Sequence, residues 1–362
     1  MTKKFKFTIN NTLGKARTGV ITTAHGQIRT PAFMPVGTKA TIKAMLPDAV
    51  RRCGADIILS NTYHLMLRPT AERIARLGGL HEFMNWSGPI LTDSGGFQVM
   101  SLASLCKITN EGALFSSHLD GAIHMLTPER ATQLQHMFGS TITMVLDQCV
   151  SFPASYSIVH DAVNLTTSWA ERSKEAFVKR DGYAQFAIMQ GGVYKDLRHK
   201  SAEDLVKLDF EGYAIGGLAV GEGQDTLFSV LDYATDYLPD NKPKYLMGVG
   251  KPSDIIGAVK RGVDMFDCVI PTRSARNGQA FTKKGTVNIR NSKYSEDPSP
   301  LDESCLCVTC REYSKAYLHH LIKTDEMLGP ILMTWHNLTY FQDLMAQIRL
   351  FIEIGKEIDF TS

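Results

Sequence analysis

The chain has 362 residues, of which 44% are hydrophobic and 21% are charged, a composition typical of a globular protein. Its formal net charge of +2 excludes a chain that is basic throughout, so any nucleic-acid binding must depend on a local cluster of basic residues. No apolar run approaches the ~18 residues of a membrane span, and the N-terminus lacks an apolar signal-peptide core, so we expect a soluble, cytoplasmic protein with no membrane partner.

Eight short apolar runs recur along the chain, and most end in polar or glycine residues. They cover residues 31–37, 55–61, 90–96, 143–149, 185–191, 212–219, 244–250 and 265–271. Their hydrophobicity is mostly continuous rather than alternating, as expected of strands buried on both faces. Helical patterns separate them, so we predict an α/β fold, specifically a (β/α)8 TIM barrel.

Three of the intervening segments carry a signal for the start of a helix. Thr127 suits an N-cap with Pro128 in the first turn, and Lys251 precedes another proline at the start of a second helix. Ser201 with Asp204 predicts a capping box that opens a third helix. The segment 98–123 and the one after the eighth run exceed normal loop length, and we expect both to carry function.

Polar and glycine residues stand where the predicted strands end. In a (β/α)8 barrel the carboxyl ends of the strands form the active-site face, so these residues should converge. They are Asn61, Asp93, Asp147, Gln190, Gly216, Gly217, Met247, Gly248 and Asp267. No G-x-G-x-x-G fingerprint follows any strand, which argues against a doubly wound sheet.

The carboxylates and the carboxamide among these residues suggest chemistry at a glycosidic bond. Asp93 and Asp267 across a pocket can cleave such a bond, one attacking the anomeric carbon and the other transferring a proton. The alternative is a divalent cation site, which would require further oxygen ligands. Asp147 and Gln190, with backbone groups at 217–218, can bind the edge of a flat heterocycle. The alternative for Gln190 alone is a hydrogen-bonded polar side chain that covers the end of the barrel.

A local excess of positive charge surrounds the eighth strand. Between residues 260 and 293, eight Lys and Arg side chains face two Asp side chains. Arg273 and Arg276 follow Pro271, which ends strand pairing, and guanidiniums at this position suit phosphate oxygens. For this run alone, a salt bridge between Asp267 and a neighbouring arginine is the simpler interpretation.

Three of the seven cysteines form a C-x-C-x-x-C cluster at Cys305, Cys307 and Cys310. An odd number of cysteines in a chain of this length does not suggest a disulfide framework. His336 can supply a fourth ligand for tetrahedral zinc, which would be structural because four protein ligands leave no open position. The histidines at 319 and 320 are competing candidates for that ligand.

A series of motifs in this order resembles the tRNA-guanine transglycosylase family, in its bacterial form, over nearly the whole chain. The motifs are T-D-S-G-G-F-Q (92–98), M-Q-G-G-V-Y-x-D-L-R (189–198), G-G-L-A-V-G-E (216–222), Y-L-M-G-V-G (245–250), M-F-D-C-V-x-P-T-R-x-A-R-N-G (265–278) and C-x-C-x-x-C with His336. The resemblance implies a TIM barrel with a zinc-binding subdomain. It also implies an enzyme of queuosine biosynthesis, a pentosyltransferase that exchanges the wobble guanine of GUN-anticodon tRNAs (those for Asp, Asn, His and Tyr) for a 7-deazaguanine base.

The resemblance assigns roles to individual residues. It implies that Asp267 is the nucleophile on ribose C1′ and that Asp93 is the general acid and base. It places at the base Phe97, Asp147, Gln190, Gly217, Leu218 and Met247. It assigns Arg273 and Arg276 to tRNA binding. It assigns one structural zinc ion per subunit to Cys305, Cys307, Cys310 and His336.

The resemblance also implies a domain organisation and a homodimer. We expect a catalytic barrel over 1–272 and a zinc-binding subdomain with tRNA-binding elements over 273–345. Residues 346–362 are expected to form a C-terminal helix that packs on the barrel. An apolar surface on the zinc-side helices would suit dimerisation.

The residue after Asp147 departs from the family pattern, and it bears on which base is used. The bacterial pattern is Asp-Glu-Cys, whereas this chain has Gln148 before Cys149. We expect 7-aminomethyl-7-deazaguanine (prequeuosine base) to be preferred, because Val220 and Cys149 narrow the pocket, with queuine as the alternative substrate.

Three further alternatives belong to other classes. A non-catalytic tRNA-binding partner would lack Asp267, and an archaeal-type enzyme acting on the D-arm would carry a C-terminal RNA-binding extension. An unrelated retaining glycosidase acting on sugars would leave the basic cluster without a role.

Overall fold

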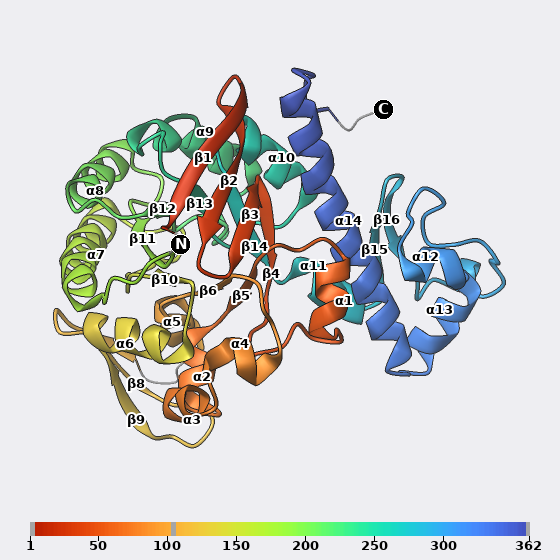
Figure 1. Ribbon diagram of the computed structural model, residues 1–362, viewed down its shortest axis with the longest axis horizontal. Coiled ribbons are helices and arrows are strands. Elements are labelled where there is room, and N and C mark those ends of the chain that lie inside the picture. Colours follow the sequence, from red (N-terminus) through yellow and green to blue (C-terminus); the bar gives the residue numbers. More distant parts are fainter. Residues whose placement is uncertain (1–3, 103–105, 360–362) are drawn as a thin grey trace.

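Eight short parallel strands close into a barrel in the computed structural model, which describes residues 4–102 and 106–359 (Figure 1). In order around the sheet they are β4 (Ala32–Pro35), β14 (Met265–Cys268), β13 (Lys244–Leu246), β12 (Gly212–Ile215), β11 (Ala184–Met189), β10 (Ile142–Met144), β6 (Ile90–Thr92) and β5 (Ile58–Ser60). A parallel bridge from Val36 to Leu59 joins the two ends of this sheet. Each strand coincides with one of the eight apolar runs, so the predicted barrel is confirmed.

Burial on both faces explains why these strands do not alternate. Every residue of β10, β11, β12 and β13 is buried. Gly212 in β12 lies opposite Phe186 in β11, and a Cβ at that position would lie 2.4 Å from the Phe186 ring. The glycine thus allows a large aromatic side chain to fill the barrel interior.

Helices surround the barrel and follow its strands. They are α1 (Pro47–Arg52), α2 (Thr62–Leu67), α3 (Ala71–Arg76), α4 (Gly79–Met84), α5 (Gly96–Leu102), α6 (Pro128–Phe138), α7 (Tyr156–Ala176), α8 (Lys195–Lys207), α9 (Gln224–Ala234) with the 3-10 turn η1 (Thr235–Tyr237), α10 (Pro252–Lys260) and α11 (Ile270–Arg276). None of the helices within 4–102 and 106–359 is long and apolar enough to cross a bilayer.

Two of the three predicted helix starts are confirmed, and one is wrong. Thr127 caps α6 by accepting a hydrogen bond from Arg130 N at 3.2 Å, and α10 begins at Pro252 after Lys251. Ser201, however, lies inside α8, which begins at Lys195. The helix continues through Ser201 because its face toward the barrel is buried on both sides of that residue. The Ser201 hydroxyl instead accepts a hydrogen bond from Gln190 N at 3.2 Å.

Two three-stranded antiparallel sheets lie outside the barrel. The first has three strands, β1 (Lys6–Leu13), β2 (Ala16–Thr23) and β3 (Gly26–Thr30). The second, β7 (Cys106–Ile108), β8 (Ala113–Ser116) and β9 (Ile123–Leu126), occupies the long segment after β6. The first sheet was not expected from the sequence, because β1 is mostly exposed and contains no apolar run.

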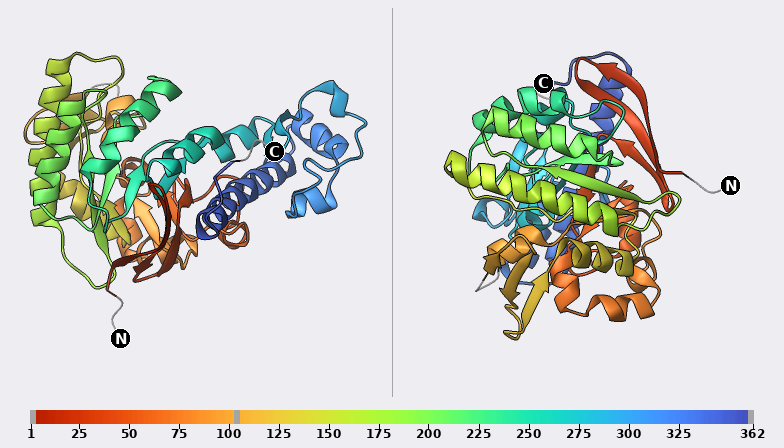
Figure 2. Two further views of the ribbon diagram at one scale, coloured as in Figure 1. Left: turned by 90° about the horizontal axis from the view of Figure 1, so that it is seen from above. Right: turned by 90° about the vertical axis from the view of Figure 1, so that its left-hand side faces the viewer.

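The C-terminal part of the chain lies beside the barrel and extends from it as an arm (Figure 2). It contains β15 (Gln279–Thr282), β16 (Gly285–Asn288), the 3-10 turn η2 (Ser292–Tyr294), α12 (Val308–Glu312), α13 (Lys315–Lys323) and the start of α14 (Leu328–Glu353). Leu332 and Met333 of α14 pack in the core of this arm, whereas Met345 and Ile348 pack in the barrel core. One unbroken helix therefore runs through the expected domain boundary at residue 345.

A buried ion pair fastens the N-terminal sheet to the barrel. Arg17 in β2 donates from Nε and NH2 to the two carboxylate oxygens of Asp264, at 2.8 and 2.6 Å. Asp264, just before β14, is fully buried and also accepts a hydrogen bond from Lys244 N. Removing the charge of one partner would leave the other buried without compensation.

We therefore predict that Asp264→Asn lowers the free energy of unfolding by about 3 kcal/mol. The matched control is Asp236→Asn, which breaks an ion pair with Lys15 in which the Asp side chain is 56% exposed. That change should cost less than about 1 kcal/mol because water screens exposed pairs. Urea unfolding followed by circular dichroism measures both, and equal costs would contradict the prediction.

Candidate active site and metal centre

Asp93 lies directly after β6 and is held by the end of the neighbouring strand. Asn61 Nδ2 donates to Asp93 Oδ2 at 2.6 Å, and the backbone N–H of Thr62 donates to Oδ1 at 2.8 Å. Burial, with a smaller contribution from the nearby Asp267 carboxylate, raises the pKa of Asp93 to about 6 against the effect of these donors. A carboxyl group with this pKa exchanges a proton readily near neutral pH.

Asp267 occupies β14 and faces the same mouth of the barrel. The Tyr245 hydroxyl donates to Asp267 Oδ1 at 2.6 Å, and Gly248 N donates to the same oxygen at 2.8 Å. In the described part of the chain Oδ2 has no hydrogen-bond partner. Burial raises the pKa of Asp267, while the two donors favour its ionised form. One oxygen is thus fixed and the other is free to react.

Asp147 and Gln190 form a hydrogen-bonded pair beside these carboxylates. Gln190 Nε2 donates to Asp147 Oδ2 at 2.7 Å, and both side chains are buried. Burial raises the pKa of Asp147 to about 6, Gln190 lowers it, and the charge of Asp93 raises it. The influence of Asp93 on Asp147, and of Asp267 on Asp93, shows that the three carboxylates lie within electrostatic reach of one another.

Glycine residues after β12 make room for this pair. A Cβ on Gly216 would lie 2.8 Å from Gln190 Nε2, and a Cβ on Gly217 would lie 2.4 Å from Gln190 Oε1. Gly217 also has a φ of +64°, which disfavours other residues. Leu218 is buried beside it, whereas Met247, after β13, is half-buried.

The remaining predicted binding residues lie farther from these hydrogen bonds. Phe97 in α5 is 52% exposed, and Arg273 in α11 is exposed. Arg276 is half-buried and donates to Thr272 O; burial and then the charge of Arg273 lower its pKa, so the two guanidiniums are close together. Asp267 forms no salt bridge with either arginine in the described chain, so the simpler interpretation of this stretch is wrong.

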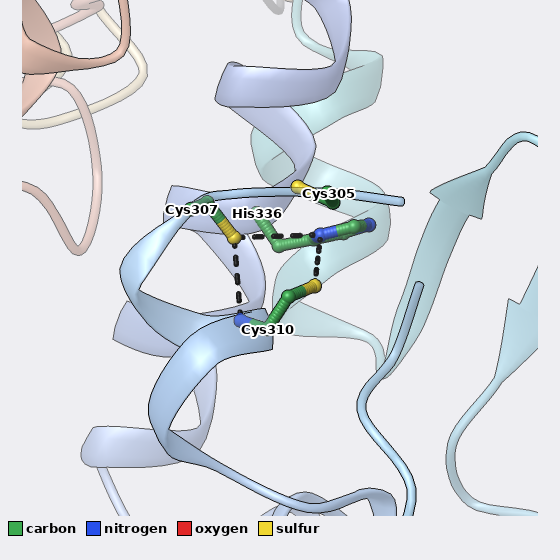
Figure 3. Close-up of side chains that lie close together, drawn as sticks. All are labelled: Cys305, Cys307, Cys310 and His336. Atoms are coloured by element: carbon green, nitrogen blue, oxygen red, sulfur yellow. Dashed lines mark hydrogen bonds between the residues drawn. The ribbon is translucent and has the colours of Figure 1, made fainter. Parts of the chain in front are cut away.

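The three clustered cysteines and His336 converge in the C-terminal arm (Figure 3). Their ligand atoms all lie within 4.8 Å of one another, and His336 Nδ1 is 3.2 Å from Cys310 Sγ. His336 Nε2 lies 2.7 Å from Phe281 O. A carbonyl oxygen can only accept, so Nε2 carries the proton and the Nδ1 lone pair faces the sulfur atoms. This donor set suits a metal ion.

The competing histidines do not take part in this cluster. His319 Nδ1 lies 2.7 Å from Ile289 O, and His320 is exposed on α13. Within 4–102 and 106–359 the Cys3His cluster is also the only group of three or more His, Cys, Asp or Glu that could hold a metal ion. The alternative of a cation between Asp93 and Asp267 is therefore not supported.

Comparisons with known proteins agree with this geometry. A family model described as "Queuine tRNA-ribosyltransferase" matches residues 12–361. Proteins named queuine tRNA-ribosyltransferase from Rickettsia bellii (strain OSU 85-389) and Rickettsia felis are each 69% identical over 359 residues, which is 99% of both chains in each case. The chain belongs to the queuine tRNA-ribosyltransferase family. The resemblance inferred from the motifs, to an enzyme that exchanges bases in tRNA, is thereby confirmed. The individual roles of the site residues remain predictions.

Several residues that support this transferase site were not singled out from the sequence. Tyr245 and Arg198 lie within the recognised motifs, but their apparent place in a strand and a helix gave no reason to expect contacts at the site. Thr62 supplies a backbone group, which no side-chain pattern reveals. Asn61, by contrast, was found through its position at a strand end.

We predict that the arm binds one metal ion per chain and that Cys307→Ala abolishes this binding, because three ligands hold the ion much more weakly than four. Cys106→Ala is the control, since Cys106 is exposed and outside the cluster. Metal content by mass spectrometry of the purified proteins checks the prediction. Full metal content in His336→Ala with loss in His320→Ala would show that the ligand assignment is wrong.

Proposed function

We propose that this transferase exchanges the wobble guanine of GUN-anticodon tRNAs, those for Asp, Asn, His and Tyr, for 7-aminomethyl-7-deazaguanine by a covalent double displacement. The observation that carries the proposal is the arrangement of Asp267 and Asp93. Asp267 has one oxygen fixed by two donors and the other oxygen free, and Asp93 has a pKa of about 6. A nucleophile and a proton-transfer group are thus within reach of one reacting carbon.

In the first step, Asp267 Oδ2 attacks ribose C1′ and the bond from C1′ to guanine N9 breaks. The electron pair leaves with the guanine, which takes a proton from Asp93. In the second step, Asp93 accepts the N9 proton of the incoming base. N9 then attacks C1′ and the Asp267 carboxylate is released. Because one group both gives and takes a proton, a pKa near 6 suits Asp93 better than the usual acidic value.

The pair of Asp147 and Gln190 supports recognition of the heterocycle. A purine-like base presents N–H donors and a carbonyl acceptor along one edge. A carboxylate matches the donors, and an amide with nearby backbone N–H groups matches the acceptor. Leu218 and Met247 would add apolar contact to the flat base, and Phe97 would stack near it.

The choice between prequeuosine base and queuine depends on the pocket beyond Asp147. Gln148 is half-buried, and its backbone N–H donates to Thr166 Oγ1 at 3.0 Å. Glutamine removes a negative charge that would favour an aminomethyl cation. Val220 and Cys149 nevertheless narrow the side where the larger substituent of queuine would lie, so we favour prequeuosine base and keep queuine as the alternative.

We propose zinc as the metal, because three thiolates and one imidazole in a buried, closed site are the ligands that structural zinc prefers. The ion would hold the arm in shape rather than take part in the reaction. Arg273 and Arg276, two close positive charges after β14, would bind phosphates of the anticodon loop. A cytoplasmic location follows from tRNA as the substrate.

We propose a homodimer formed through the arm. Met327 is 83% exposed at the start of α14, and Leu306 is 82% exposed beside the metal cluster. Ile331, one turn further along α14, is also exposed. Apolar side chains exposed to this degree commonly lie in interfaces between subunits.

The proposed nucleophile is tested with Asp267→Asn, which keeps an acceptor for Tyr245 and Gly248. We predict that guanine exchange into tRNA falls by at least about 1,000-fold and that no denaturation-resistant protein–RNA adduct forms, because an amide cannot attack C1′. Asp254→Asn, in the first turn of α10, is the control. Gel electrophoresis under denaturing conditions detects the adduct. An adduct in Asp267→Asn would assign the attack to another group.

The proposed base preference is tested with Gln148→Glu. We predict that the wild type has a higher kcat/KM for prequeuosine base than for queuine. In Gln148→Glu, the kcat/KM for prequeuosine base relative to that for guanine should rise about tenfold, because the added carboxylate attracts the aminomethyl cation. Gln133→Glu, on the exposed face of α6, should leave the ratio unchanged. A wild-type preference for queuine would show that the steric argument from Val220 is wrong.

A further inference from the structure

The side chain of Arg198, in the first turns of α8, is fully buried beside the candidate base-binding site. Its NH1 donates to the carbonyl oxygens of Met189 at 2.9 Å and Gly216 at 2.8 Å. Its Nε donates to Gly192 O at 2.9 Å, and its NH2 lies 3.5 Å from Gly217 O. One guanidinium therefore joins the loop after β11 to the loop after β12.

Among the described residues, the charge of this guanidinium has no ion-pair partner. Over residues 4–102 and 106–359, no Asp or Glu oxygen lies within salt-bridge distance of Arg198. Burial lowers the pKa of Arg198 to about 10, so the group still carries its charge at neutral pH. Burying an unpaired charge is costly unless fixed dipoles replace the lost water, and here backbone carbonyls supply them. A fully desolvated cation whose partners are all backbone carbonyls, at the end of β11 and in the loops after β11 and β12, holds those loops in one conformation.

The orientation of these carbonyls determines where the loop's N–H groups point. In a trans peptide unit the C=O and N–H bonds point in opposite directions. The carbonyls of Gly216 and Gly217 face Arg198, so the N–H groups of Gly217 and Leu218 face away from it. The Gly217 N–H donates a hydrogen bond to the Cys149 sulfur. This bond lowers the pKa of the Cys149 thiol, whereas burial raises it. Within the described residues, no protein group accepts a hydrogen bond from the Leu218 N–H.

Helix α8 also holds the backbone of Gln190. Ser201 lies three residues after Arg198, on the same buried face, and its hydroxyl accepts the Gln190 N–H. The residue on one side of Gln190, Met189, gives its carbonyl to Arg198, and Gly191 approaches so closely that a Cβ there would lie 2.7 Å from Arg198 N. Both base-reading loops are thus fixed from a single helix.

We propose that Arg198, assisted by Ser201, is a positioning residue for base binding, which directs the Leu218 N–H and the Gln190 side chain toward the carbonyl edge of the incoming heterocycle. This inference rests on the proposed base exchange. Arg198 does not contact the base itself. It acts by fixing peptide groups before the base arrives, so its loss weakens base binding more than it slows the chemical step.

The test uses Arg198→Lys, in which an ammonium keeps the charge but cannot donate to four carbonyls in a planar fork. The matched control is Arg349→Lys in α14. Arg349 is half-buried, its NH1 donates to Pro31 O at 2.8 Å, and burial likewise lowers its pKa to about 10. Ser201→Ala is the milder variant, which removes one neutral hydrogen bond and leaves the helix intact.

For Arg198→Lys we expect KM for the base to rise about tenfold, while kcat falls by less than about threefold and KM for tRNA is unchanged. For Ser201→Ala we expect KM for the base to rise about threefold. Arg349→Lys should also lower Tm, by less than Arg198→Lys because Arg349 is less buried, but leave every KM at the wild-type value. Steady-state exchange of labelled guanine and thermal unfolding provide these readouts.

A purely structural role would give a different pattern. The proposal is overturned if KM for the base stays within twofold of wild type in folded Arg198→Lys, or if Arg349→Lys raises it equally. If Arg198→Lys does not fold, an unchanged KM in Ser201→Ala overturns it. Absence of any guanine exchange in the wild type would instead defeat the proposed function, and calorimetric titration with the free base would then decide the role of Arg198.

Discussion

The barrel mouth is organised around the cost of burying three carboxylates within electrostatic reach of one another. The pKa values of Asp93, Asp147 and Asp267 are raised because burial removes the carboxylates from water. A neighbouring negative charge also raises the pKa of the first two. Each is supported by donors from an adjacent strand end. The parallel barrel makes this arrangement possible, since it brings the carboxyl ends of all eight strands to one face.

Much of the fold and site followed from local patterns in the sequence. Continuous apolar runs identified all eight strands, because strands buried on both faces need no alternation. Asp267 stood out as a charge inside such a run, and Asn61, Asp93 and Gln190 stood out because they stand where predicted strands end. The metal cluster was found through cysteine spacing, and the choice of His336 over nearer histidines agrees with the observed geometry.

The features that were missed depend on contacts between distant segments. β1 is mostly exposed and is stabilised by pairing with β2, so its own residues carry no apolar run. Ser201 has the chemistry of a helix cap, but packing of α8 on the barrel outweighs that local preference. Arg198 binds carbonyls of two loops, and backbone acceptors leave no trace in the pattern of side chains.

Because α14 is one continuous helix, it fixes the orientation of the metal cluster relative to the barrel. His336 points into the cysteine cluster, while Met345 and Ile348, nine and twelve residues later on the same helix, pack in the barrel core. Each inserted residue rotates the rest of an α-helix by about 100°. The number of residues between the metal ligand and the barrel contacts is therefore fixed. Substitutions can accumulate along this segment, but insertions and deletions cannot.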